Sequence, residues 1–157
     1  MTARPAKRRV LVLCTGNSCR SQMAEGWINH LLGQRWEARS AGTRPALAVH
    51  PLAVKVMAEA GVDISGAVPR EVQPLLGEPW DLVVTVCDHA REVCPAFPRR
   101  VEQIHVSFAD PSFAPGDEPE RLRAFRQTRD EIRARLLPAI EERGRGEGER
   151  SPGDRKD

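Results

Sequence analysis

The chain lacks tyrosine, and aromatic residues make up only 4% of its 157 positions. It has no apolar run near the roughly 18 residues that a membrane helix needs. The first ten residues are basic but contain no apolar stretch typical of a signal peptide. The formal net charge of +2 is too small to argue for a nucleic-acid partner. We therefore expect a cytoplasmic protein with no membrane or nucleic-acid partner.

Cysteine is also scarce, with four residues in the whole chain. Because cytoplasmic thiols stay reduced, chemistry explains these residues better than structural disulfides do. The four histidines are scattered and have no paired cysteines beside them, so no metal site is firmly indicated. The length suits one domain with a full hydrophobic core, and we expect a monomer with one active site.

Short apolar runs alternate with helical patterns, which predicts a single α/β domain. The expected architecture is a four-stranded parallel sheet with helices on both faces. Strands are predicted at 10–13, 37–41, 82–86 and 104–108, helices at 21–32, 51–60 and 122–140, and a short helix or turn at 70–76. Pro138 should kink or shorten the last helix. The domain is expected to cover 9–142, after a basic arm at 1–8 and before a disordered tail at 143–157.

The strongest chemical signal follows the first predicted strand, where Cys14 leads into a small, polar loop and then a helix. Loop N–H groups and the positive end of a helix together form a cradle for an anion. Arg20 adds a planar guanidinium that can hold two oxygens of a tetrahedral anion. In such surroundings the pKa of a cysteine falls from about 8.5 to roughly 3.5–7.5, so a Cys14 thiolate is expected. The predicted oxyanion-binding loop comprises Thr15, Gly16, Asn17, Ser18, Cys19, Arg20 and Ser21.

The alternative is that Cys14 is a buried, inert residue before an ordinary helix, but this leaves Gly16, Asn17 and Arg20 unexplained. Asn17 suits a left-handed backbone conformation and can brace the loop through side-chain hydrogen bonds. Two roles stay open for Cys19, which either packs the loop or forms an oxidative disulfide with Cys14.

Cys87 and Cys94 form a second pair of interest. Cys87 follows a predicted buried strand, so it should emerge at the same sheet edge as Cys14. If the segment from Cys87 to Cys94 is helical, the two residues lie about 10.5 Å apart along the axis, whereas a disulfide needs Cα atoms within about 7 Å. A bond between them would therefore require this segment to unwind. The alternative is that both cysteines only fill space in the core.

The segment from Cys14 to Trp27 resembles the start of the thioredoxin-coupled arsenate reductases, which are built on the low-molecular-weight protein tyrosine phosphatase fold. The resemblance covers residues 9–142 and implies a flavodoxin-like order of strands. Its other motifs are Trp36, Ser40-Ala41-Gly42, Asp81 to Cys87, Cys94-Pro95, Asp110-Pro111 and Arg129-Asp130-Glu131-Ile132.

The resemblance implies a relay of thiols with no bound cofactor. Cys14 attacks arsenate to give a covalent adduct, and Cys87 then attacks Cys14 and releases arsenite. Cys94 attacks Cys87 in turn, which leaves a Cys87–Cys94 disulfide for thioredoxin to reduce. Phosphate and sulfate should compete with arsenate for the loop. Asp110 matches the general acid that protonates the departing oxygen, although an Asp-Pro pair is also common in simple turns.

Some reductases of this family bind potassium near the loop through residues that match Asn17, Glu25 and Ser40. A further carboxylate of that site aligns with Arg70 in this chain. Because an arginine repels a cation, three roles stay open for Glu25: a potassium ligand, the partner of an ion pair, or an ordinary acid in the first turn of the helix.

Three other functions stay open at this point. A low-molecular-weight tyrosine phosphatase would use the same loop, but it needs only one thiolate and water. A noncatalytic oxyanion-binding redox sensor would signal through Cys87 and Cys94 without turnover. A reductase could also draw its electrons from mycothiol or glutathione in place of thioredoxin.

Overall fold

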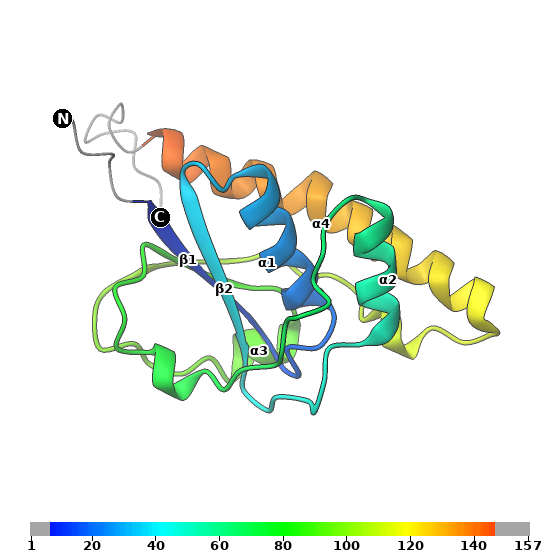
Figure 1. The fold of residues 1–157 in the computed structure, drawn as a ribbon. Coiled ribbons are helices and arrows are strands. Elements are labelled where there is room, and N and C mark those ends of the chain that lie inside the picture. Colours follow the sequence, from blue (N-terminus) through cyan, green and yellow to red (C-terminus); the bar gives the residue numbers. More distant parts are fainter. Residues whose placement is uncertain (1–6, 147–157) are drawn as a thin grey trace.

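Four parallel strands form the centre of the protein, in a computed structural model that describes residues 7–146. The strands are β1 (Arg8–Cys14), β2 (Trp36–Gly42), β3 (Leu82–Thr85) and β4 (Glu102–His105), in the order β2-β1-β3-β4 (Figure 1). The predicted parallel sheet and its flavodoxin-like order are therefore confirmed. β1 lies in the middle of the sheet, and its residues from Val10 to Leu13 are fully buried, as a continuous apolar run predicts.

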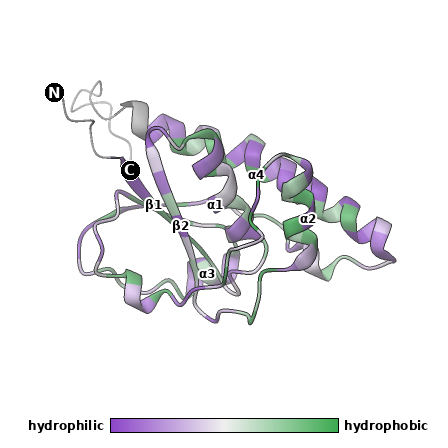
Figure 2. Cartoon of the chain, viewed as in Figure 1, coloured by the Kyte–Doolittle hydropathy of each residue, from purple (hydrophilic) through white to green (hydrophobic). Residues whose placement is uncertain are grey.

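Three of the four helices pack against one another. They are α1 (Arg20–Leu31), α2 (Pro51–Glu59) and α4 (Glu118–Gly146), and α4 runs alongside the other two (Figure 1). Hydropathy alternates along α4, as expected of a helix with one buried face (Figure 2). The buried positions of this helix are Leu122, Phe125, Thr128, Ile132, Leu136, Leu137 and Ile140.

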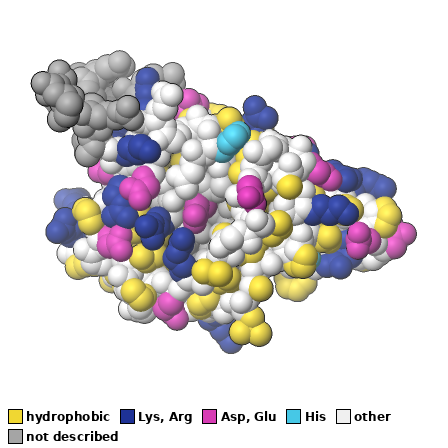
Figure 3. Space-filling view, in the orientation of Figure 1, with side chains coloured by type: hydrophobic (Ala, Val, Ile, Leu, Met, Phe, Trp, Pro, Cys, Tyr) yellow, Lys and Arg dark blue, Asp and Glu magenta, His cyan; other side chains and the backbone are white. Residues whose placement is uncertain are grey.

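The shorter elements lie at the carboxyl ends of the strands or close to them. Helix α3 (Asp88–Glu92) follows β3 and contacts both β1 and β3. Two single turns of 3-10 helix, η1 (Gln73–Leu75) and η2 (Pro111–Phe113), complete the fold. None of the helices among residues 7–146 is long and apolar enough to cross a membrane. Basic and acidic side chains are interspersed over the face seen in Figure 3, in keeping with the small net charge.

Several boundaries differ by a few residues from those predicted, and the largest differences are at the ends of β4 and α4. β4 ends at His105 instead of reaching residue 108, although the N–H groups of Val106 and Phe108 still donate to the carbonyls of Thr85 and Val86, at 3.0 and 3.1 Å. α4 passes through Pro138 and reaches Gly146, beyond the predicted end of the domain at residue 142. An ion pair of 3.0 Å between Arg143 and Glu102 ties this last part of α4 to β4. Most of the arm predicted at 1–8 and most of the tail predicted at 143–157 lie outside the described residues.

Candidate functional site: the loop between β1 and α1

The loop after β1 is held from outside by the chain that follows β2. The N–H groups of Arg44, Ala46 and His50 donate to the carbonyl oxygens of Thr15, Gly16 and Ser18, respectively, each at 2.9 Å. These three bonds fix the backbone of the loop between β1 and α1. This arrangement suits the binding of an anion.

Asn17 sets the shape of the loop. Its φ of 51° is the only positive value among the described residues other than glycine, which confirms the predicted left-handed conformation. The side chain is fully buried. Its Nδ2 donates to Ser21 Oγ at 2.7 Å and to Ser40 Oγ at 2.9 Å, while its Oδ1 accepts from Gln22 Nε2 at 3.0 Å and from the Arg70 N–H at 2.9 Å. Asn17 therefore joins the loop to α1, to β2 and to the segment before η1.

Arg20 and Asp110 meet at the mouth of the loop, although 90 positions separate them in the chain. The Arg20 guanidinium lies 3.2 Å from a carboxylate oxygen of Asp110 and also donates to the Phe108 carbonyl at 3.0 Å. Asp110 caps η2 by accepting from the N–H and the hydroxyl of Ser112, at 2.9 and 2.7 Å. Pro111 is the first residue of this turn and fixes its backbone. The structure thus places a carboxyl group beside the cradle, where the sequence predicts an acid.

Cys87 lies next to Cys14, close enough for each thiol to shift the pKa of the other. Its Sγ also lies 3.4 Å from Thr15 Oγ1 and accepts from the Ala90 N–H at 3.4 Å, so that Cys87 caps α3. The predicted convergence of Cys14 and Cys87 is therefore confirmed. It arises because β1 and β3 are neighbours and both end at this edge of the sheet.

The contact between the two thiols opposes the expected ionisation of Cys14. The hydrogen bond with Cys87 and burial raise the pKa of Cys14 more than the charge of Arg20 lowers it. The same hydrogen bond, helped by those from Thr15 and Ala90, lowers the pKa of Cys87 to about 5. Arg20 thus acts on the pKa of Cys14 in the predicted direction, but the contact with Cys87 and burial oppose it.

The other two cysteines differ in burial. Cys94 is half-buried beyond the end of α3, where its Sγ is 3.9 Å from Gln103 Oε1 and burial raises its pKa. Cys19 is buried inside the loop, and burial raises its pKa to about 11. All four cysteines are free thiols.

Comparisons with known proteins agree with this geometry. Residues 9–142 match the low molecular weight phosphotyrosine protein phosphatase family. The chain belongs to this family. An arsenate reductase from Halalkalibacterium halodurans is 48% identical over 130 residues, which cover 83% of this chain and 93% of that protein.

Two solved structures show the same fold. One is an arsenate reductase in the phosphate-binding state, with a TM-score of 0.66 and 27% identity over 86% of this chain and 98% of that one. The other is a thioredoxin-dependent arsenate reductase from Corynebacterium glutamicum, with a TM-score of 0.60 and 28% identity. It is matched over 87% of this chain and 63% of that protein.

Sequence reasoning missed two residues near the loop between β1 and α1 of this family member. Gln22 donates to the carbonyl and the side chain of Asn17 and to the Val68 carbonyl. His105 bridges Thr85 and Asp88 behind Cys87. Polar residues at buried helix positions could have pointed to Gln22, but nothing in the sequence pattern connects His105 with Asp88.

The residues around Glu25 do not fit a potassium ion. The Arg70 guanidinium donates to Glu25 Oε1 and to the Ser40 carbonyl, each at 3.2 Å. A cation bound to this carboxylate would lie against a second positive charge. Elsewhere in residues 7–146, no group of three or more His, Cys, Asp or Glu residues could hold a metal ion.

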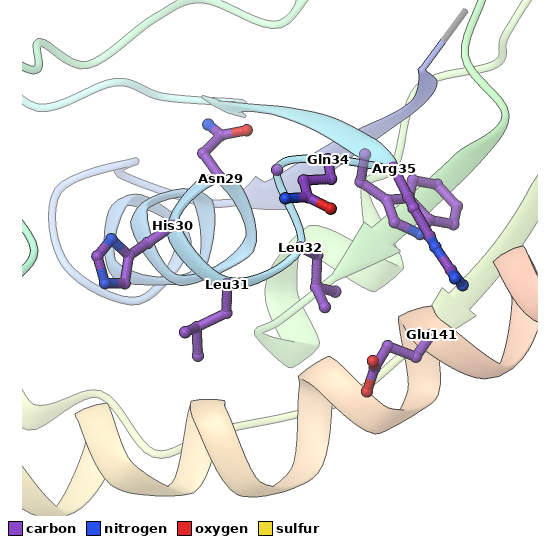
Figure 4. A pocket seen from close by; sticks show the side chains of 9 residues that line it. Asn29, His30, Leu31, Leu32, Gln34, Arg35 and Glu141 are labelled. Atoms are coloured by element: carbon purple, nitrogen blue, oxygen red, sulfur yellow. The ribbon is translucent and has the colours of Figure 1, made fainter. Parts of the chain in front are cut away.

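A cavity of about 640 Å³ lies between the end of α1, the start of β2 and Glu141 of α4 (Figure 4). It is at the amino end of the sheet, because α1 starts at the loop and runs away from it for 12 residues. A helix of that length spans about 18 Å. This cavity is therefore separate from the candidate site.

Proposed function

We propose that this protein reduces arsenate to arsenite through Cys14, Cys87 and Cys94, with thioredoxin as the electron donor. The observation that carries the proposal is the contact between Cys14 and Cys87 at the anion cradle. A hydrolase of this fold needs one thiolate and water, whereas a reductase needs a second thiol to dispose of two electrons. The 48% identical arsenate reductase supports the substrate, and the thioredoxin-dependent relative supports the donor.

In the first step, arsenate binds in the loop against its N–H groups and the Arg20 guanidinium. Cys14 attacks arsenic, and its proton passes along the hydrogen bond to the Cys87 thiolate. One oxygen of arsenate leaves as water after Asp110 protonates it. Arsenic stays in oxidation state +5 in the Cys14 adduct, so no electrons have yet been transferred.

In the second step, Cys87 attacks the sulfur of Cys14. The S–As bond breaks, and its electron pair stays on arsenic, which leaves as arsenite in oxidation state +3. The proton of Cys87 goes to the departing arsenite. Two thiols have then been oxidised to a Cys14–Cys87 disulfide, which balances the two electrons gained by arsenic.

In the last step, Cys94 attacks Cys87 and frees Cys14. Cys87 caps α3 and Cys94 lies beyond its other end, so α3 has to unwind before the two sulfurs can join. The resulting Cys87–Cys94 disulfide is the bond that thioredoxin reduces. Cys94 is the more exposed of these two cysteines, which suits attack by a partner protein.

The test is arsenite formation with thioredoxin, thioredoxin reductase and NADPH. Wild type should turn over repeatedly, whereas Cys94→Ser should stop after about one turnover and accumulate the Cys14–Cys87 disulfide. Cys19→Ser is the matched control, because this cysteine has no part in the relay. No arsenite from wild type, or repeated turnover by Cys94→Ser, would overturn the proposal.

The family match leaves two competing functions, and assays on the same purified protein distinguish them. A tyrosine phosphatase would hydrolyse aryl phosphates without forming arsenite, and Cys87→Ala would keep that activity. A redox sensor would form a disulfide with no net arsenate turnover. Repeating the assay with glutathione or mycothiol in place of thioredoxin identifies the donor.

A further inference from the structure

Arg70 makes four hydrogen bonds with the network that supports the oxyanion loop. Its backbone N–H donates to Asn17 Oδ1 at 2.9 Å, and its carbonyl accepts from the Gly42 N–H at 2.8 Å. Its guanidinium donates to Glu25 and to the Ser40 carbonyl, each at 3.2 Å. One residue thus touches the loop through its backbone and the adjoining acid through its side chain.

Glu25 completes the network from the other side. Ser40 Oγ accepts from Asn17 Nδ2 at 2.9 Å and donates to Glu25 Oε1 at 2.7 Å. Arg70, Glu25, Ser40 and Asn17 therefore form a closed ring of hydrogen bonds. Because Ser40 can donate its single proton only once, its bond to Asn17 is oriented by the bond to Glu25.

The carboxylate of Glu25 needs a positive partner in this position. Its side chain is 18% exposed, and an acid with so little solvent contact is costly to leave unpaired. The carbonyl of Ser40 adds a second oxygen that faces the same guanidinium. Oxygen groups of this kind would otherwise attract a free monovalent cation.

We propose that Arg70 is a positioning residue whose guanidinium acts as a built-in cation for the oxyanion loop. It fixes Glu25, and through Ser40 it holds Asn17 in the left-handed conformation on which the cradle depends. Anion binding by this protein is therefore independent of potassium. The inference rests on the anion-binding role proposed for the loop, and it does not depend on the thiol relay.

The test measures the affinity of inorganic phosphate for the loop in buffers of equal ionic strength containing choline or potassium chloride. Wild type should bind phosphate equally well in both. Arg70→Gln should bind it about fivefold more weakly in choline and recover in potassium, because removal of the guanidinium exposes the oxygens of Glu25 and Ser40. Arg70→Lys keeps a positive charge and should remain close to wild type.

Two further variants make the test specific. Arg123→Gln removes an exposed arginine on α4 and should bind phosphate like wild type. When Glu25→Gln is already present, adding Arg70→Gln should weaken phosphate binding less than Arg70→Gln does in wild type. The reason is that the negative charge that Arg70 neutralises is gone. Strictly additive effects of the two changes would contradict the ring.

The proposal is overturned if potassium strengthens phosphate binding by wild type, or if Arg70→Gln in choline binds phosphate like wild type. The first of these outcomes needs no variant, so the test stands even if Arg70→Gln unfolds. Normal phosphate binding without arsenite formation would overturn the reductase proposal and leave this one intact. In the arsenate assay, Arg70→Gln should raise KM in choline and leave kcat within about twofold of wild type.

Discussion

The Asp88 carboxylate accepts a hydrogen bond of 2.9 Å from His105 Nε2 and so ties the first turn of α3 to the end of β4. The other ring nitrogen of His105 lies 2.7 Å from Thr85 Oγ1. The hydrogen bond with His105 lowers the pKa of Asp88, so the carboxylate is charged near neutral pH. This chain of contacts holds the helix that separates Cys87 from Cys94.

Weakening this contact should speed the joining of Cys87 and Cys94. With Cys14 and Cys19 changed to serine, Asp88→Asn should raise the rate of disulfide formation by diamide roughly two- to fivefold. The reason is that α3 opens more easily without its charged N-terminal partner. Thiol trapping followed by mass spectrometry gives the rate. Glu92→Gln, on the same helix, is the control and should not accelerate disulfide formation. An unchanged rate in Asp88→Asn would show that the contact between Asp88 and His105 does not hold α3.

Removal of Cys87 should lower the pKa of Cys14. The hydrogen bond with Cys87 is the largest cause of the raised value, and burial comes second, while Arg20 acts in the opposite direction. In Cys87→Ala the alkylation of Cys14 by iodoacetamide should therefore have its midpoint at lower pH than in wild type. Cys94→Ala should leave the midpoint unchanged. A midpoint that rises in Cys87→Ala would contradict the assigned thiol contact.

Asp110→Asn should reduce arsenate turnover without disturbing the turn at η2. An amide oxygen can still accept from Ser112, but the amide cannot deliver a proton to the departing oxygen. We expect kcat to fall by roughly 10²–10⁴, which is the usual contribution of a general acid. Ser112→Ala, which removes one hydrogen bond to Asp110, should have a much smaller effect. A kcat of Asp110→Asn within twofold of wild type would exclude the acid role.

Substitutions at Asn17 should separate backbone strain from hydrogen bonding. Both Asn17→Ala and Asn17→Gly lose the buried side-chain contacts, which should reduce the free energy of unfolding by about 2–4 kcal/mol. Glycine tolerates the φ of 51°, whereas alanine should lose roughly a further 1 kcal/mol. Urea unfolding monitored by circular dichroism measures both values. Equal stabilities of the two variants would mean that residue 17 no longer adopts a φ of 51° in the alanine variant.

The pairing of α2 with α4 should contribute stability that depends on pH. Arg126 donates to both carboxylate oxygens of Glu59, at 2.9 and 2.8 Å, and Arg129 adds a bond of 3.2 Å. These contacts lower the pKa of Glu59 from its ordinary value of 4.5 to about 2. A lowered carboxyl pKa adds stability above about pH 4.5, and that stability is lost as the pH falls toward 2. The Tm of Glu59→Gln should thus lie below that of wild type at pH 7, and the gap should narrow below pH 4.5; a gap independent of pH would contradict this.

Much of the candidate site follows from local sequence. The apolar run before Cys14 predicts a buried strand, and the polar loop before the helix predicts a cradle with Asn17 in a left-handed conformation. Both features depend on nearest neighbours along the chain, which a sequence displays directly. The sequence pattern did not reveal the partner of Asp88, because His105 comes from a distant segment, and only the family resemblance brought Arg70 near Glu25.

The sequence by itself determined the parallel α/β fold, the left-handed conformation of Asn17 in the loop and the positions of the cysteines at the ends of predicted elements. These features rest on hydrophobic periodicity and on the residue types that loops and helix starts require. Only the tertiary structure decided which groups surround Cys14. Because β1 and β3 are neighbours, Cys87 lies against Cys14 and opposes the ionisation that the local sequence predicts for it. Ionisation depends on every group within a few ångströms, and folding determines which groups those are.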